Sequence, residues 1–201
     1  MPFHCPRAAI VAAGSAIALL LTSCDTKTAQ CDSLIDTINE GIELIEDFEG
    51  KSQTFEAATA DAKTPKAIAP IMNDFANELE LFNEDLAGVA DEVGSLELKD
   101  ESLTGFQQQY SENLKQLNGL FGTLTQALRD MGTVLTSIAN TPPNQITPDK
   151  AQKWTADAKK AEASLATVET DSDKATQAID QIADEINTYC GREASAGEAD
   201  E

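Results

Sequence analysis

Residues 101–140 read ESLTGFQQQYSENLKQLNGLFGTLTQALRDMGTVLTSIAN and contain no proline. Apolar side chains recur along this stretch at spacings of three and four residues, which is the period of one face of an α-helix. A helix over the whole stretch would extend about 60 Å, and its apolar face would need other helices to cover it. The positions on that face are Leu103, Phe106, Tyr110, Leu114, Leu117, Phe121, Leu124, Leu128, Met131, Leu135 and Ile138.

Three further segments show the same period, and residues typical of helix ends separate them. We predict helices over about 28–62, 70–93, 101–140 and 148–190. Pro70 is expected in the first turn of the second helix, where proline is tolerated. Asp100 is expected to cap the third helix, and Thr147-Pro148 to start the fourth. Gly191 is expected to form the C-terminal cap of the fourth helix.

The connections between these segments are short, so neighbouring helices should be antiparallel. The sequence therefore predicts an all-α fold over residues 31–191, an elongated up-down-up-down four-helix bundle with coiled-coil-like packing. The small share of aromatic residues, 5%, suits helices filled with Leu, Ile and Ala. Two long hairpins that associate as a dimer fit the same pattern and are the alternative. An acidic tail over residues 192–201 is expected to be disordered.

The first residues have the composition of a targeting segment. Arg7 precedes an apolar run of 14 residues, AAIVAAGSAIALLL, which is short for a membrane span. Leu21-Thr22-Ser23-Cys24, at the end of this run, resembles the lipobox of bacterial lipoproteins, in which cleavage occurs before the cysteine. This resemblance implies a signal peptide over 1–23, lipid on Cys24 and a tether over 24–30. A signal peptide followed by an incidental cysteine is the alternative.

The lipobox resemblance also implies a cellular location. The protein would be exported to the bacterial cell envelope and held by membrane lipid through the acylated Cys24, because several acyl chains anchor a protein stably. Asp25 resembles a residue that retains some lipoproteins at the inner membrane. Since that rule differs between bacterial groups, inner and outer membrane both stay open.

Two cysteines remain after the signal peptide and the proposed lipid site. Cys31 and Cys190 lie near the two ends of the predicted bundle, and an exported protein enters a compartment where disulfides persist. In an up-down-up-down bundle the first helix starts at the end where the fourth helix finishes, so we expect these two residues to form a disulfide. Two unpaired, buried thiols are the alternative.

The sequence lacks the usual residues of catalytic and metal sites. The one histidine, His4, falls in the predicted signal peptide, and no glycine-rich phosphate loop or calcium loop occurs. We therefore expect no enzyme activity, no catalytic residues, no bound metal and no cofactor. The formal net charge of −21 would repel phosphate backbones, which makes nucleic acid an unsuitable partner.

Charge is distributed unevenly along the predicted bundle. Residues 50–77 and 123–164, next to the first and third connections, hold eight basic and seven acidic side chains, whereas the rest of the chain is strongly acidic. We predict that this less acidic tip contacts a partner. The alternatives are that its charges only keep the surface solvated and that the tryptophan belongs to the core. The candidate residues are Lys63, Lys66, Lys150, Lys153 and Trp154.

These observations favour a non-enzymatic interaction or spacer module that displays its tip to an envelope or extracellular protein. The alternative function is a carrier that binds an apolar ligand between the helices. Four glycines within the third helix are interpreted as composition without a structural role, with close helix approach as the alternative. They are Gly105, Gly119, Gly122 and Gly132.

Overall fold

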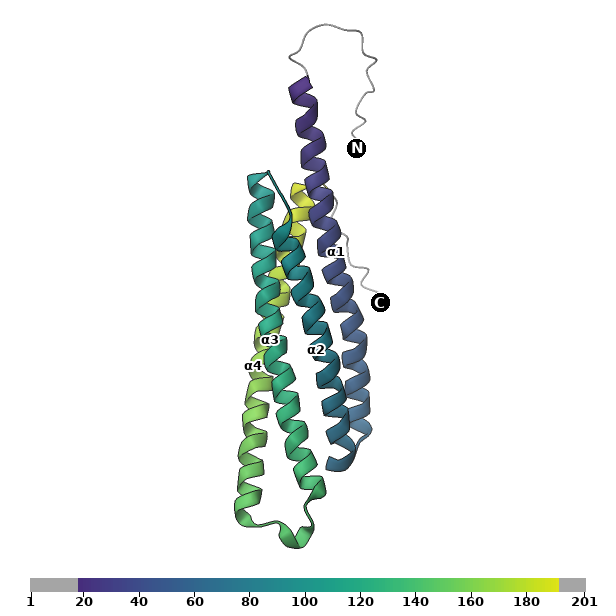
Figure 1. Ribbon diagram of the computed structural model, residues 1–201, viewed down its shortest axis with the longest axis vertical. Coiled ribbons are helices and arrows are strands. Elements are labelled where there is room, and N and C mark those ends of the chain that lie inside the picture. Colours follow the sequence, from purple (N-terminus) through teal and green to yellow (C-terminus); the bar gives the residue numbers. More distant parts are fainter. Residues whose placement is uncertain (1–17, 192–201) are drawn as a thin grey trace.

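The computed structural model describes the backbone of residues 18–191 and the side chains of residues 27–191. Four long helices and one short 3-10 turn make up this part of the chain, which contains no strand. The predicted all-α four-helix bundle is confirmed, and Figure 1 shows the helices side by side along one long axis. The elements are α1 Ala18–Asp61, α2 Pro65–Ser95, α3 Glu101–Asn140, η1 Pro143–Gln145 and α4 Pro148–Tyr189.

Successive helices run in opposite directions, so the connections gather at two ends. The α1–α2 and α3–α4 connections lie at one end, here called the distal end. The α2–α3 connection and the last turn of α4 lie at the other, here called the proximal end, and the first turns of α1 project beyond it (Figure 1). The predicted up-down-up-down order is therefore the observed one.

The four helices do not contribute equally to the packing. α3 packs along both α2 and α4, whereas α1 rests mainly on α2 and approaches α3 and α4 over a short stretch. The backbones of α2 and α4 do not come within 8 Å of each other. The segment with the most regular apolar pattern is thus the helix that joins α2 and α4, whose backbones do not approach each other directly.

The second helix begins five residues earlier than predicted. Thr64 caps it by accepting a hydrogen bond from the Ala67 amide at 3.3 Å, and Pro65 occupies its first turn. Pro70 therefore lies inside α2, where its ring nitrogen has no hydrogen to donate to the Lys66 carbonyl. The prediction that Pro70 marks the helix start is wrong, because the Thr64-Pro65 cap sets the start upstream.

The first helix also starts earlier than predicted. α1 is already helical at Ala18, so the predicted tether over residues 24–30 is part of a helix. No proline or glycine occurs between residues 18 and 40, and nothing in that stretch ends a helix. The predicted signal peptide lies mostly, and the acidic tail over 192–201 entirely, outside the described residues.

The other predicted helix ends are confirmed. The Asp100 carboxylate accepts hydrogen bonds from the Ser102 and Leu103 amides at 3.0 and 3.1 Å. Thr147 accepts from the Lys150 amide at 3.3 Å and Pro148 follows it. Gly191 has a φ of 71°, the left-handed conformation that ends many helices and that glycine adopts without strain.

Aromatic side chains fill the middle of the bundle between α1, α2 and α3. Phe48 and Phe82 stack with ring centroids 4.2 Å apart, and Phe82 meets Phe121 edge to face at 5.0 Å. Phe55 stacks on Phe75 at 4.1 Å. Such pairs add to the free energy gained by burying the rings themselves. These phenylalanines therefore belong to the hydrophobic core between α1, α2 and α3 or pack against it.

The α2–α3 interface constrains one of the four glycines of α3. A Cβ atom at Gly132 would lie 2.5 Å from Oδ1 of Asn73, and one at Gly122 would lie 3.7 Å from Nδ2 of Asn83. A Cβ at Gly105 or Gly119 would meet no atom within 4 Å. The four glycines therefore differ at Gly132, where a Cβ requires the Asn73 side chain of α2 to move.

Candidate functional site

A disulfide between Cys31 and Cys190 joins α1 to the end of α4 at the proximal end. Their Cα atoms are 5.8 Å apart, and 159 residues separate them in the sequence. Cys31 is buried and belongs to the main hydrophobic core. The predicted pairing is the one the structure contains.

A set of polar and aromatic contacts surrounds this disulfide and connects α1, the α2–α3 connection, α3 and the end of α4; we call it the proximal cluster. The Tyr189 hydroxyl donates to the Asp100 carboxylate, at 3.0 Å from each oxygen. Gln30 Oε1 accepts hydrogen bonds from the Lys99 and Asp100 amides, the second at 3.1 Å. The cluster consists of Lys27, Gln30, Cys31, Lys99, Asp100, Phe106, Tyr189 and Cys190.

The aromatic ring of Tyr189 is contacted on more than one side. The Lys27 ammonium lies 3.7 Å from its centroid, a cation–π distance. Phe106 of α3 meets the same ring edge to face at 5.7 Å. With its hydroxyl held by Asp100, the Tyr189 ring has a fixed position between α1, α3 and α4.

Asp100 is the charged centre of the proximal cluster. Its pKa is lowered from the usual aspartate value, mainly because the Leu103 amide donates a hydrogen bond to the charged form. The Tyr189 hydroxyl, the Ser102 amide and the Lys27 charge act in the same direction, while partial burial opposes them. One carboxylate thus caps α3 and links α3 to the end of α4.

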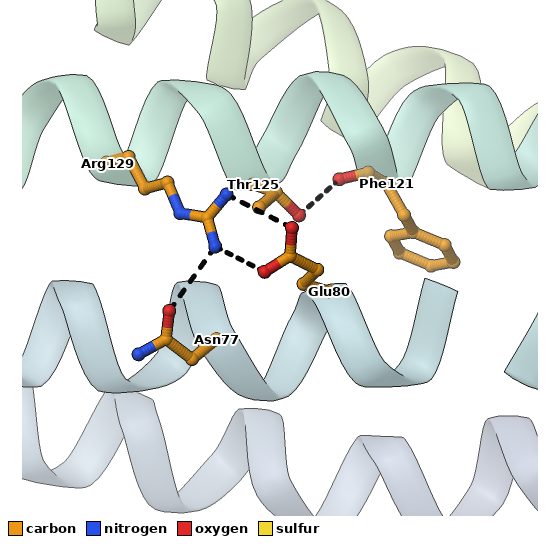
Figure 2. Close-up of polar contacts among 5 residues, drawn as sticks. All are labelled: Asn77, Glu80, Phe121, Thr125 and Arg129. Atoms are coloured by element: carbon orange, nitrogen blue, oxygen red, sulfur yellow. Dashed lines mark hydrogen bonds and ion pairs between the residues drawn. The ribbon is translucent and has the colours of Figure 1, made fainter. Parts of the chain in front are cut away.

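A second polar link joins α2 and α3 closer to the distal end (Figure 2). Both terminal nitrogens of Arg129 reach the Glu80 carboxylate, at 2.5 and 3.4 Å, and Nη2 also donates to Asn77 Oδ1 at 3.3 Å. The hydrogen bond from Arg129 lowers the pKa of Glu80. Since both side chains are well exposed to solvent, we expect this pair to stabilise the contact between the two helices only slightly.

The predicted tip residues lie at the distal end, but on two separate hairpins. Lys63 and Lys66 flank the α1–α2 connection, whereas Lys150, Lys153 and Trp154 occupy the first turns of α4. All four lysines are exposed, and Lys153 forms an ion pair with Asp157 at 2.6 Å. Trp154 is half-buried and lies outside the main core cluster. The structure therefore brings these residues to one end without joining them into one patch.

One buried group that the sequence did not single out is the Tyr110 hydroxyl. Tyr110 is 0% exposed, and its oxygen has no hydrogen-bond partner among the described residues. Burial, helped by the charge of Asp180, raises its pKa. A Cβ atom at Gly41 would lie 3.3 Å from this oxygen, so the absence of a side chain there gives the hydroxyl its space. Tyr110 occupies a position of the apolar pattern of α3. That pattern does not indicate that its hydroxyl oxygen lacks a hydrogen-bond partner in the described part of the chain.

Two of the surface grooves have partly apolar linings, and the second includes two residues of the proximal cluster. One of about 370 Å³ follows the α1–α2 seam and is lined by Phe55, Ile71 and Phe75 together with charged residues. Another of about 630 Å³ lies between α3 and α4 at the proximal end and is lined by Phe106, Gln181, Asp184, Glu185, Thr188 and Tyr189. Both open to solvent.

The side chain of Cys24, the predicted lipidation site, lies outside the described side chains. Within the described part of the chain, no three His, Cys, Asp or Glu side chains are grouped so that they could hold a metal ion. No helix in that part has the length and apolar character needed to cross a membrane. The chain matches no protein-family model, no curated protein and no solved structure.

Proposed function

We propose that the protein is a lipid-anchored lipoprotein of the bacterial cell envelope. In this proposal the helical bundle is a non-enzymatic interaction and spacer module that presents its distal end to a protein partner. The observation that supports it best is that α1 is already helical between Cys24, the first residue after the proposed cleavage, and Cys31 in the bundle. A helix transmits the direction of an anchor to the domain, which a flexible linker does not.

The dimensions suit a spacer. Cys24 and Cys31 are seven residues apart, which is about 10 Å in a helix. Helices of 40 and 42 residues then extend about 60 Å to the distal end. The exposed lysines at the two distal connections would thus stand well clear of the lipid headgroups, where they can meet acidic groups of another protein.

The anchor is tested by lipid labelling. We expect the chain to incorporate labelled palmitate, and Cys24→Ala to abolish the label and release the protein from the membrane fraction. Cys31→Ala serves as the matched control, since it removes a nearby thiol and should keep the label. Incorporation that is unchanged in Cys24→Ala would refute the proposed anchor.

The partner is tested by photocrosslinking in the native cell. A photoreactive amino acid replaces Lys66 or Lys150 at the distal end, or Glu43 or Glu112 along the exposed sides of the bundle as controls. We expect one protein to be captured from the distal positions and not from the controls. Equal capture from all four positions would show that the distal end is not the contact surface.

A carrier for an apolar ligand is the second candidate, and the groove on the α1–α2 seam favours it. Its volume of about 370 Å³ is within the range of small-molecule sites, and Phe55, Ile71 and Phe75 offer an apolar floor. Native mass spectrometry of the purified protein tests this. A co-purified small molecule that is lost in Phe55→Ala would favour the carrier over the spacer.

A further inference from the structure

The proximal groove between α3 and α4 combines aromatic and acidic side chains along one helix face. Four lining residues lie on one side of α4, because the second, third and fourth follow the first by three, four and seven residues. They are Gln181, Asp184, Glu185 and Thr188. Phe106 of α3 and the ring of Tyr189 complete the lining. This surface lies at the opposite end of the bundle from the lysines proposed to meet the distal partner.

The aromatic part of the groove has a fixed geometry. Tyr189 is held by Asp100 through its hydroxyl and by Phe106 through an edge-to-face contact. The Lys27 ammonium lies over the Tyr189 ring, 3.7 Å from its centroid, so a cation of a ligand has to replace it there or contact Phe106 instead. Rings that are fixed before a ligand arrives lose little conformational freedom on binding.

The six lining residues include two acidic side chains and no basic one, although the Lys27 ammonium lies over the Tyr189 ring. Both acids, Asp184 and Glu185, are exposed. The Glu185 carboxylate accepts a hydrogen bond from Gln181 Nε2 at 3.0 Å, which orients it along the helix. No ion pair in the described part of the chain uses Asp184 or Glu185. A ligand with cationic side chains would therefore complement both the acids and the rings.

From this geometry we propose that the proximal groove binds an arginine- or lysine-bearing segment of a partner protein. The groove is open along one side, whereas small-molecule sites enclose most of their ligand. Its face on α4 spans residues 181–188, about 10 Å, which matches roughly three residues of an extended peptide. Basic side chains at the two ends of such a tripeptide would reach the carboxylates and the aromatic pair.

The test measures peptide binding to the full-length chain in nonionic detergent by NMR titration. The probe is acetyl-Arg-Gly-Arg-amide, and the reference is the same peptide with citrulline in place of arginine, which keeps the shape and removes the charge. We expect the arginine peptide to shift the amide signals of residues 181–189 and the citrulline peptide to leave them unchanged. Shifts confined to other regions, or equal binding of both peptides, would overturn the proposal.

Two variants separate the acids from the rings. Asp184→Asn with Glu185→Gln should weaken binding about fivefold by removing both carboxylates. Phe106→Leu keeps the charge and should weaken binding about two- to fivefold by removing one ring. The matched control is Glu46→Gln with Asp47→Asn, which removes the same charge from an acidic surface of α1 without an aromatic lining.

The control decides between a specific groove and general attraction to an acidic protein. We expect Glu46→Gln with Asp47→Asn to bind the arginine peptide as the parent does. An equal loss in both acid-pair variants would refute the groove, because it would show that net charge alone attracts the peptide. Circular dichroism confirms that each variant keeps its helices, and neither acid-pair variant changes a buried residue.

Discussion

Tyr189 and Asp100 form a hydrogen bond across 89 residues of sequence, with the hydroxyl 3.0 Å from each carboxylate oxygen. The same carboxylate caps α3, and the same tyrosine immediately precedes the disulfide-bonded Cys190. The start of α3 and the end of α4 are therefore fixed to each other by one contact beside the covalent link.

Tyr189→Phe tests this contact, because it removes the hydroxyl and keeps the ring. We expect the free energy of unfolding in urea at neutral pH to fall by about 0.5–1 kcal/mol, the usual value for one partly exposed hydrogen bond. Asp100 has a lowered pKa when folded, so its contribution is present above the unfolded value near 3.8 and is lost as pH falls through the folded value. The difference between parent and variant should accordingly shrink below about pH 4. A difference that grows on acidification would contradict this link.

Removing the disulfide with Cys31→Ser and Cys190→Ser should destabilise the protein more than any other change considered. The closed loop of 159 residues corresponds to at most about 5 kcal/mol in the chain-entropy model. The measurement is the urea midpoint of the variant against that of the oxidised parent. The reduced parent is the control and should match the variant. Alkylation of Cys31 and Cys190 in the unreduced protein would show that the bond is absent.

Gly132→Ala tests the close approach of α2 and α3. A Cβ at this position would lie 2.5 Å from Asn73 Oδ1, so the substitution should be destabilising despite the better helix propensity of alanine. Gly119→Ala is the matched control in the same helix and should stabilise by up to about 1 kcal/mol. In an Asn73→Ala background, Gly132→Ala should also become stabilising. If Gly132→Ala behaves like Gly119→Ala in the parent, the helices are not in close contact there.

Glu80→Gln tests the second polar link between α2 and α3. The hydrogen bond from Arg129 lowers the pKa of Glu80, so the stabilisation is present above about pH 4.5 and is lost as pH falls through the lowered value. We expect a small decrease in the urea midpoint at neutral pH that vanishes in strong acid and diminishes in high salt. Equal midpoints for parent and variant at every pH would show that the pair contributes nothing.

For the proposed lipid-anchored protein, the uneven charge predicts an orientation on the membrane. The acidic side chains near the proximal end should be repelled by anionic headgroups within a screening length of about 8–10 Å at physiological salt. We therefore expect neutron reflectometry on supported anionic bilayers to show the bundle upright at low salt and more tilted at high salt. A bundle that lies flat under both conditions would contradict this prediction.

Much of this architecture follows from the sequence because its signals are local. The apolar period of residues 103–138 identifies α3, and Asp100 and Thr147-Pro148 give helix starts that the structure confirms. Once the topology is known, the pairing of Cys31 with Cys190 follows from the two ends that it brings together. Pro70 was misassigned because two prolines compete for the start of α2 and only the upstream one has a threonine cap.

The contacts of the proximal cluster had no such signal. The contacts among Gln30, Lys27, Tyr189 and Asp100 form only when three helices are in register. Each of these residue types is common on a helix surface, so the sequence does not mark them. Gly132 looks like Gly119 in the sequence, and the difference between them is the side chain of Asn73 on another helix. Such information is contained in the packing of neighbours and not in the spacing along one segment.

The bond between Cys31 and Cys190 has a mechanical consequence. Cys31 begins the bundle in the sequence and Cys190 ends it, and their bond holds the two residues together in space. A force applied to either terminus therefore reaches the fold at this bond. Tension between the two terminal segments therefore passes through the sulfur atoms and leaves the 159-residue loop unstretched. Only a load applied at the far connections would shear the helices against one another.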